Sequence, residues 1–289
     1  MDLMQRRGEY NVPPQAGPIL GVEFAGVIEE LGKGNVSGFK VGDEVFGLAY
    51  GGAYAEYIAT STKMLIHKPG ELSWEEAAGI PETWITATQA LHLVGCIKDR
   101  NNVLFHAGAS SVSIAGIQLA QAAGAKAVFV TAGSDEKIKF CEQELGATKG
   151  FNYHTTDWVK GIHDATDNYG VDVIIDFIGG DYAQKNFKVA AMDARIVQLA
   201  SMGGSTVSDL DIGLLVGKRL RWEGSTLRSR NLEYQGRLRD LLVETALPKF
   251  VDGTFKVQID KIFNWKDIQA AHTWMESNTS KGKIICMVE

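Results

Sequence analysis

The sequence has little of what marks a secreted, metal-binding or membrane-spanning protein. Its 289 residues contain three cysteines without CxxC spacing, which is typical of reduced thiols in a cytosolic protein rather than of a disulfide framework or a zinc site. No apolar run approaches the roughly 18 residues that a transmembrane helix needs. The first ten residues, MDLMQRRGEY, contain no apolar signal-peptide segment. We therefore expect a soluble, cytoplasmic protein.

An excess of positive charge is also absent. Lys and Arg number 29 against 35 Asp and Glu, so the net charge is −6 at pH 7. A protein that binds the phosphate backbone of nucleic acids needs a basic surface, so this class is excluded. The histidines, scattered without the spacing of metal ligands, are His67, His92, His106, His154, His163 and His272. We expect no bound metal.

Glycine, by contrast, is abundant: 32 residues, or one in nine, compared with about 7% in an average protein. The glycines cluster where apolar strands turn into helices. From residue 102 onwards, apolar strands alternate with amphipathic helices. Strands of this kind are continuous apolar runs, because helices cover both faces of a parallel sheet. We predict an α/β fold with a Rossmann-type, doubly wound parallel sheet.

The two ends of the chain have a different pattern. The first third consists of short, glycine-rich strand segments, and the last forty or so residues return to strand, helix and strand. We predict a β-rich catalytic domain built from residues 1–84 and 251–289. The Rossmann domain, residues 85–250, would be inserted between these two parts.

The turn after the first strand of the alternating region suggests a nucleotide site. Such a turn brings pyrophosphate to a helix N-terminus, and its glycines let backbone and phosphate approach. Here it reads Gly108-Ala109-Ser110-Ser111-Val112-Ser113. The hydroxyls of Ser110 and Ser111 could donate to phosphate, but Ser113 places a side chain where helix and strand pack. We expect weakened cofactor affinity, since a Cβ at a position that needs positive φ or close packing costs about 1 kcal/mol.

The end of the next strand bears on which dinucleotide binds. An NAD site has an Asp or Glu here for the ribose 2′-hydroxyl, whereas this strand ends Thr131-Ala132-Gly133-Ser134. Gly133 leaves room, Ser134 offers a hydroxyl and Lys137 offers positive charge to a 2′-phosphate. We expect NADP(H), with a solvated helix lysine as the alternative reading of Lys137.

Several motifs in one order carry a resemblance that covers essentially the whole chain: GVEFAGVIEELG, FKVGDEVFGL, AAGIPETWITATQALHLVG, VTAGSDEK and STLRSR. The chain resembles the zinc-free NADPH:quinone oxidoreductases of the medium-chain dehydrogenase/reductase superfamily, which include zeta-crystallin. The resemblance implies a GroES-like catalytic domain, a Rossmann NADP-binding domain and a homodimer formed through the latter. It also implies that about forty residues found in relatives before the DLMQRRG helix are missing here, which leaves a sheet edge unpaired.

The resemblance implies roles for individual residues. Tyr10 would donate a hydrogen bond to the substrate, and Thr86 would lie near the nicotinamide. The positions that match cofactor-binding residues are Ser110, Ser111, Val112, Ser134, Lys137, Tyr153, Ile178, Gly179, Ser201, Met202, Gly203, Leu227, Arg228 and Arg230. Val22 stands where zinc-dependent relatives have the histidine of Gly-His-Glu, which implies zinc independence. The alternatives are that Tyr10 only covers a loop and that the arginines are solvated.

The activity that the resemblance implies is hydride transfer from NADPH to a quinone or a similar conjugated carbonyl acceptor, in which the cofactor carries the chemistry. An enoyl or enone reductase is the second enzymatic hypothesis. The serines at positions 111 and 113 suggest a third hypothesis, a catalytically impaired nucleotide-binding or regulatory protein. The sequence does not indicate the natural acceptor.

Overall fold

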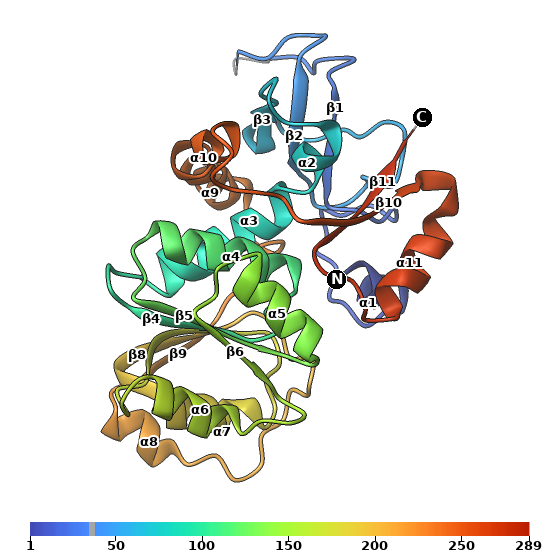
Figure 1. The fold of residues 1–289 in the computed structure, drawn as a ribbon. Coiled ribbons are helices and arrows are strands. Elements are labelled where there is room, and N and C mark those ends of the chain that lie inside the picture. Colours follow the sequence, from blue (N-terminus) through green and yellow to red (C-terminus); the bar gives the residue numbers. More distant parts are fainter. Residues whose placement is uncertain (35–37, 289) are drawn as a thin grey trace. The chain divides into compact units, whose positions relative to one another are not determined.

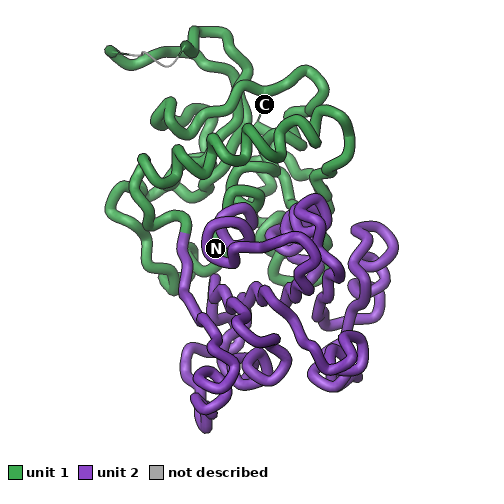
Figure 2. The backbone as a smooth tube through the Cα atoms, turned by 90° about the vertical axis from the view of Figure 1, so that its left-hand side faces the viewer, with its two compact units in different colours: residues 1–85, 227–289 green, residues 86–226 purple. Residues whose placement is uncertain are grey.

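The computed structural model describes residues 1–34 and 38–288. The chain forms two compact units, Met1–Ile85 with Leu227–Glu289, and Thr86–Thr226 (Figure 2). Every residue of the second unit is described. Its core is a six-stranded parallel sheet with the order β6-β5-β4-β7-β8-β9.

The strands of this sheet are β4 (Asn102–Phe105), β5 (Ala127–Ala132), β6 (Lys149–Asn152), β7 (Val171–Asp176), β8 (Ala190–Gln198) and β9 (Arg221–Gly224). Its helices are α4 (Ser111–Ala122), α5 (Asp135–Gln143), α6 (Trp158–Ala165), α7 (Tyr182–Val189), α8 (Ile212–Gly217) and the π-helix η2 (Gln89–Val94). Figure 1 shows α4 and α5 on one face of the sheet, and α6, α7 and α8 on the other. The predicted doubly wound parallel sheet is confirmed.

The central strands are apolar along their whole length because both faces of the sheet are covered. All four residues of β4 are buried, and β7 is buried at every position except Asp172. On one face, Leu104, Ile174 and Phe187 of α7 lie in one hydrophobic cluster and are each fully buried. The continuous apolar runs in the sequence therefore correspond to the interior of the sheet.

The described part of the first unit contains an antiparallel sheet β1-β2-β3 and a parallel pair β10-β11. Its strands are β1 (Glu23–Val27), β2 (Glu44–Leu48), β3 (Leu65–His67), β10 (Ile259–Asn264) and β11 (Lys283–Met287). Its helices are α1 (Asp2–Arg6), η1 (Thr62–Met64), α2 (Trp74–Ala78), α9 (Leu232–Thr245), α10 (Leu247–Val251), η3 (Trp265–Asp267) and α11 (Ile268–Glu276). Helix α3 (Pro81–Thr88) contains the boundary at residue 85.

Two helices begin at residues that favour a helix start. Ser73 caps α2 by accepting from the Glu76 backbone N–H at 3.2 Å, while the Glu76 carboxylate accepts from the Ser73 N–H at 2.8 Å, which is a capping box. Helix α3 begins at Pro81, a residue suited to a first turn. Among the described residues, no helix combines the length and the apolar character needed to cross a membrane.

The second domain boundary lies elsewhere than expected. The sequence placed it at residue 250, whereas the compact units divide between Thr226 and Leu227. Residues 227–250 belong to the first unit because α9 packs there on η1. Arg239 Nη1 donates to the Leu65 carbonyl at 2.5 Å, and Lys63 forms an ion pair with Glu233. The helical pattern of α9 is equally compatible with either unit, and only these long-range contacts assign it.

Candidate functional site

The start of α4 lies at the carboxyl end of β4 and has the geometry of an anion site. Ser110 is the N-cap residue, and its Oγ accepts from the Ser113 N–H at 3.3 Å. The N–H groups of Ser111 and Val112 have no intrahelical acceptor, and the Ser111 hydroxyl bonds to no other described residue. These donors, together with the helix dipole, favour a negatively charged group.

The packing cost expected at Ser113 is absent from the structure, whereas the expected weakening of cofactor affinity stays a prediction. Ser113 is fully buried, and its hydroxyl donates to the His106 carbonyl at 3.0 Å. Ser111 and Ser113 both lie in α4 with helical backbone. The residue in the left-handed region is Ala107, with φ of 49°. Serine at position 113 therefore satisfies a buried carbonyl without backbone strain.

Two glycines provide the close contact between α4 and the sheet. A Cβ at Gly108 would lie 2.7 Å from the Cβ of Val130, and one at Gly116 would lie 2.7 Å from Cζ of Phe105. Both distances are shorter than side-chain carbons tolerate. The small residues that this turn requires are thus Gly108 and Gly116 rather than glycines at 111 and 113.

The end of β5 gathers three of the predicted residues. Ser134 is the N-cap of α5, and its Oγ accepts from the Lys137 backbone N–H at 3.2 Å. A Cβ on Gly133 would lie 2.5 Å from the Tyr153 hydroxyl oxygen, so the phenol lies directly over the glycine. Tyr153 remains 40% exposed. Ser134, the backbone of Lys137 and the Tyr153 phenol therefore lie next to the strand end.

The segments that follow β7 and β8 lie side by side. The Met202 N–H donates to the Phe177 carbonyl at 3.0 Å, and the Gly203 N–H donates to the Ile178 carbonyl at 2.8 Å. Gly179 has φ of +66°, and a Cβ there would lie 2.9 Å from the Gly204 carbonyl oxygen. Because the strands are parallel, these segments share one edge of the sheet with the starts of α4 and α5.

Asp176, which was not predicted from the sequence, holds the segment that follows β7. Asp176 ends β7 and is fully buried, and its Oδ1 accepts from the Ile178 and Gly179 N–H groups at 2.6 and 3.1 Å. A sequence signal existed, since Asp176 directly follows the apolar run VII and precedes two glycines in FIGG. A polar residue at the end of a buried strand needs a partner.

The predicted substrate residue Tyr10 lies in the first unit against Arg228. The Arg228 guanidinium carbon is 5.3 Å from the centroid of the Tyr10 ring, which is within cation–π range. Burial raises the pKa of the Tyr10 phenol, and the charge of Arg228 only partly offsets this. Tyr10 is therefore a neutral hydroxyl donor near pH 7.

Arg228 is buried rather than solvated, being 6% exposed. Its Nε donates to the Tyr50 carbonyl and its Nη1 donates to Oε1 of Gln5, each at 2.7 Å. Its Nη2 is buried and has no hydrogen-bond partner among the described residues. Arg228 thus contributes one unused donor to the interior of the first unit.

The other two residues of the same loop are also packed in the first unit. Leu227 is 7% exposed, and the Arg230 guanidinium lies 4.5 Å from the ring centroid of Tyr234. A cavity of about 10 Å³, roughly the space of one water molecule, is lined by Met1, Val22, Leu48, Ala49, Glu82, Leu227 and Arg228. Val22 is buried and apolar, so this wall offers no metal ligand at that position.

Glu82, on the wall of this cavity, belongs to a charged cluster that the sequence did not indicate. Its backbone N–H donates to the Glu23 carboxylate at 2.9 Å, and Glu23 forms an ion pair with Lys283 of β11. Burial, and next the repulsion of Glu23, raise the pKa of Glu82. Burial alone would lower the pKa of Lys283, but the two carboxylates raise it. Lys283 thus interacts with two carboxylates, Glu23 and Glu82, that come from other parts of the chain.

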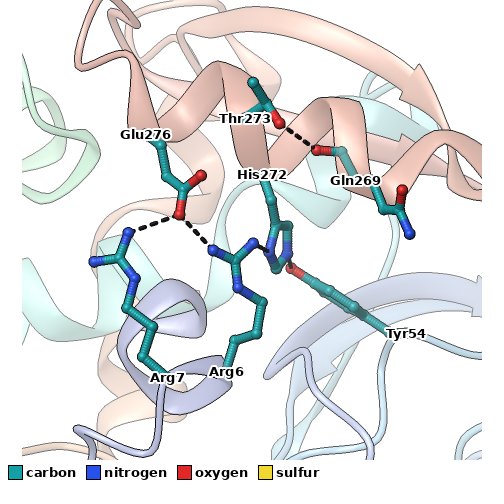
Figure 3. Close-up of polar contacts among 7 residues, drawn as sticks. All are labelled: Arg6, Arg7, Tyr54, Gln269, His272, Thr273 and Glu276. Carbon is teal, nitrogen blue, oxygen red and sulfur yellow. Dashed lines mark hydrogen bonds and ion pairs between the residues drawn. The ribbon is translucent and has the colours of Figure 1, made fainter.

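A second cluster holds α1 against α11 (Figure 3). Arg6 donates to Nδ1 of His272 at 2.9 Å and, with Arg7, forms an ion pair with Glu276. Because arginine can only donate, the His272 proton resides on Nε2, which lies 3.2 Å from the Tyr54 hydroxyl. Burial, and next the charge of Arg6, lower the pKa of His272. The cluster fixes α1, which carries the Gln5 partner of Arg228.

The predicted residues are divided between the two units. Tyr10, Leu227, Arg228 and Arg230 belong to the first unit, and the other predicted residues belong to the second. Thr86 is the first residue of the second unit and is half-buried in α3. Within residues 1–34 and 38–288, no group of three or more His, Cys, Asp or Glu side chains is placed to hold a metal ion.

Two family models match different parts of the chain, and the second match extends past the boundary at residue 226 into the first unit. Residues 1–70 match the alcohol dehydrogenase GroES-like domain, and residues 111–244 match the zinc-binding dehydrogenase family. The chain is similar to quinone oxidoreductase-like protein 2 of Bos taurus, with 29% identity over 287 residues, which cover 98% of this chain and 80% of that protein.

Solved structures of similar fold include Escherichia coli quinone oxidoreductase complexed with NADPH, with 27% identity and a TM-score of 0.83 over 98% of this chain and 87% of that one. The CurK enoyl reductase is 30% identical, with a TM-score of 0.79 over 94% of this chain and 79% of that one. The chain also matches polyketide synthases, but spans only 10% of the length of the highly reducing polyketide synthase ALT1 of Alternaria alternata.

Proposed function

The chain belongs to the medium-chain dehydrogenase/reductase superfamily of NAD(P)-dependent oxidoreductases, and from this premise we propose that it transfers a hydride from NADPH to a quinone or a similar conjugated carbonyl compound, without zinc. The observation that supports the proposal most is the start of α4. There Ser111 and Val112 offer unused donors at the carboxyl end of a parallel strand, as a pyrophosphate group requires. The similar Escherichia coli enzyme was solved with NADPH.

The residues at the neighbouring strand ends fit the rest of such a cofactor. Ser134, Lys137 and Tyr153 lie beside Gly133, where a dinucleotide fold binds the adenosine ribose. A hydroxyl and an ammonium group suit a 2′-phosphate, whereas an NAD site uses an acid at the end of this strand. Ile178, Gly179, Ser201, Met202 and Gly203 lie along the same carboxyl end of the sheet, in two segments held together by backbone hydrogen bonds.

Tyr10 is the proposed donor to the substrate. When bound, NADPH supplies the hydride, and an acceptor that gains it develops negative charge on its oxygen. A neutral phenol within a partly dry site stabilises that charge by a hydrogen bond. Arg228 lies against the Tyr10 ring, and its positive charge makes the phenol a stronger donor. Arg228 would therefore act through Tyr10, while Thr86 would contact the nicotinamide.

The proposal is tested in two steps with the purified chain. The first is a fluorescence titration with NADPH and, in parallel, with NADH, for which we expect tighter binding of NADPH. A matched pair of variants, Lys137→Ala and Lys139→Ala, should separate the proposed 2′-phosphate contact from general charge, because only Lys137 has its backbone N–H bonded to Ser134 Oγ. The second step follows NADPH oxidation by an ortho-quinone. A folded chain that binds neither dinucleotide would refute the proposal.

Reduction of an activated alkene is the second candidate function. The identity of 30% to the CurK enoyl reductase favours it, as do the matches to polyketide synthases. An enoyl thioester and an ortho-quinone should be compared as substrates under the same conditions. A higher kcat/KM for the thioester would identify the protein as an enoyl reductase. NADPH binding without turnover of either substrate would indicate a binding protein.

A homodimer through the Rossmann unit is part of the proposal. Strand β9 pairs only with β8 in the fully described second unit, so one side of it is a sheet edge. All four residues of β9 are exposed, and an exposed edge can pair with the same strand of a second copy. Sedimentation should show a dimer at micromolar concentration, and a monomer there would contradict this.

A further inference from the structure

A chain of buried hydrogen bonds connects the ends of three neighbouring strands in the second unit. His106, which follows β4, lies 2.9 Å from Oγ1 of Thr131 on β5 through Nδ1, and 2.7 Å from Oδ1 of Asn186 on α7 through Nε2. Asn186 Nδ2 donates to Oδ2 of Asp176 at 2.8 Å. All four side chains are fully buried. We call these four residues the His106 relay.

The donor and the acceptor of each hydrogen bond in the relay can be assigned starting from Asp176, its last member. The other oxygen of Asp176 accepts from the backbone of Ile178 and Gly179, and Asn186 turns its amide NH₂ towards the carboxylate. Its carbonyl oxygen must then accept from His106, which places the histidine proton on Nε2. His106 Nδ1 consequently accepts from the Thr131 hydroxyl. Each donor and acceptor of the relay is thus paired in one arrangement of the protons.

The surroundings of His106 keep the imidazole neutral. Burial lowers its pKa, and the nearby Asp176 and the bond to Asn186 only partly oppose this. The other titratable group against the ring is Tyr182, whose ring centroid is 4.7 Å away. Burial raises the pKa of Tyr182 to about 12, so it too is neutral. A protonated His106 would have to donate from both nitrogens, which Thr131 could accept only by reversing its hydroxyl.

The relay ends at backbone that carries predicted cofactor contacts. Asp176 holds the N–H groups of Ile178 and Gly179, where Gly179 and Gly180 both have positive φ. At the other end, the His106 carbonyl accepts from Ser113 in the first turn of α4. The relay therefore joins the start of α4, the end of β5 and the segment after β7.

We propose that His106 and Asn186 are positioning residues for the dinucleotide, because through Asp176 they hold the segment Phe177–Gly180 in the conformation that receives it. The inference rests on the proposed cofactor site. It assigns a role to two residues that are fully buried. It also predicts that a defect in the relay weakens binding more than the loss of a buried hydrogen bond elsewhere in the same sheet.

The test compares Asn186→Ala with Asn102→Ala. Asn102 is a matched control because it is also buried and also donates one side-chain bond, to the Gly170 carbonyl at 2.9 Å, but at the opposite end of β4. The first measurement is hydrogen exchange of the Ile178 and Gly179 amides, which needs no ligand. We expect about tenfold faster exchange in Asn186→Ala than in Asn102→Ala, as for the loss of one buried hydrogen bond.

The second measurement is the Kd for NADPH, which should rise about tenfold in Asn186→Ala and stay within about twofold in Asn102→Ala. Equal exchange in the two variants would overturn the relay, as would faster exchange without a change in Kd. Wild-type protein that does not bind NADPH would instead refute the proposed function, and the exchange experiment would still decide whether the relay holds the segment.

Asn186→Asp supplies a conditional rescue. An aspartic acid at 186 can donate to Asp176 only when protonated, and two buried carboxyl groups in contact share one proton with a raised upper pKa. Below that pKa the relay is restored, and above it the two carboxylates repel each other. The Kd of this variant relative to wild type should therefore increase as pH rises from about 5.5 to about 8.5. A ratio independent of pH would contradict the proton arrangement.

Discussion

Replacing Ser113 by alanine tests whether the serine turn contributes to the fold. The Ser113 hydroxyl donates to the His106 carbonyl at 3.0 Å in a fully buried place. Removing it deletes this bond and the one that the Ser110 hydroxyl donates to Ser113 Oγ at 3.1 Å. It also leaves the buried carbonyl unsatisfied, and together these losses cost about 1–3 kcal/mol. Alanine has a higher helix propensity than serine, which offsets about 0.5 kcal/mol of this loss. The expected loss in the free energy of unfolding is therefore about 1–2 kcal/mol.

Chemical denaturation followed by tryptophan fluorescence measures this, because Trp158 is buried in the core of the same unit. The two units can unfold in separate transitions, so the change should be confined to one of them. Ser111→Ala is the control, since the Ser111 hydroxyl bonds to no described residue, and it should stay within about 0.5 kcal/mol of wild type. Equal effects of the two variants would refute the reasoning. Ser113→Gly should destabilise further and should not tighten NADPH.

Three other substitutions have defined expected outcomes. Gly116→Ala should lower the free energy of unfolding by about 1–3 kcal/mol, because its Cβ would overlap the buried Phe105 ring; Gly217→Ala, with no heavy atom within 4 Å of its Cβ, should be close to neutral in the same denaturation assay. The pKa of Glu82 is raised in the folded state above its unfolded value of 4.5. Such a carboxyl stabilises the fold at pH values below 4.5, and this stabilisation is lost as the pH rises through the folded-state pKa. Glu82→Gln should thus be more stable than wild type near pH 8, with the advantage vanishing towards pH 4, and thermal unfolding at both pH values checks the sign. Tyr10→Phe should reduce kcat/KM for a quinone about 10- to 100-fold at an unchanged Kd for NADPH; wild-type rates would remove it from the site.

Local patterns were sufficient to predict the architecture of the second unit. The apolar runs that form β4 and β7 lie in the middle of the sheet, and Ser73, Glu76 and Pro81 are residue types that favour the helix starts they occupy in α2 and α3. These signals are carried by residues within a few positions of one another, since strand burial and helix capping depend on neighbours in sequence. The gathering of Ser134 and Tyr153 at one sheet edge follows from the parallel order of the strands.

The sequence by itself determined the parallel α/β sheet, the caps and the positions of the turns, because hydrophobic periodicity and turn chemistry act over short stretches of chain. Only the tertiary structure decided that residues 227–250 join the first unit, that Arg228 is buried against Tyr10, and that Ser113 satisfies a carbonyl instead of crowding a strand. The physical reason is that burial and hydrogen bonding of polar groups depend on partners far away in sequence. His106 shows this most clearly, since its bond to Asn186 joins residues 80 positions apart.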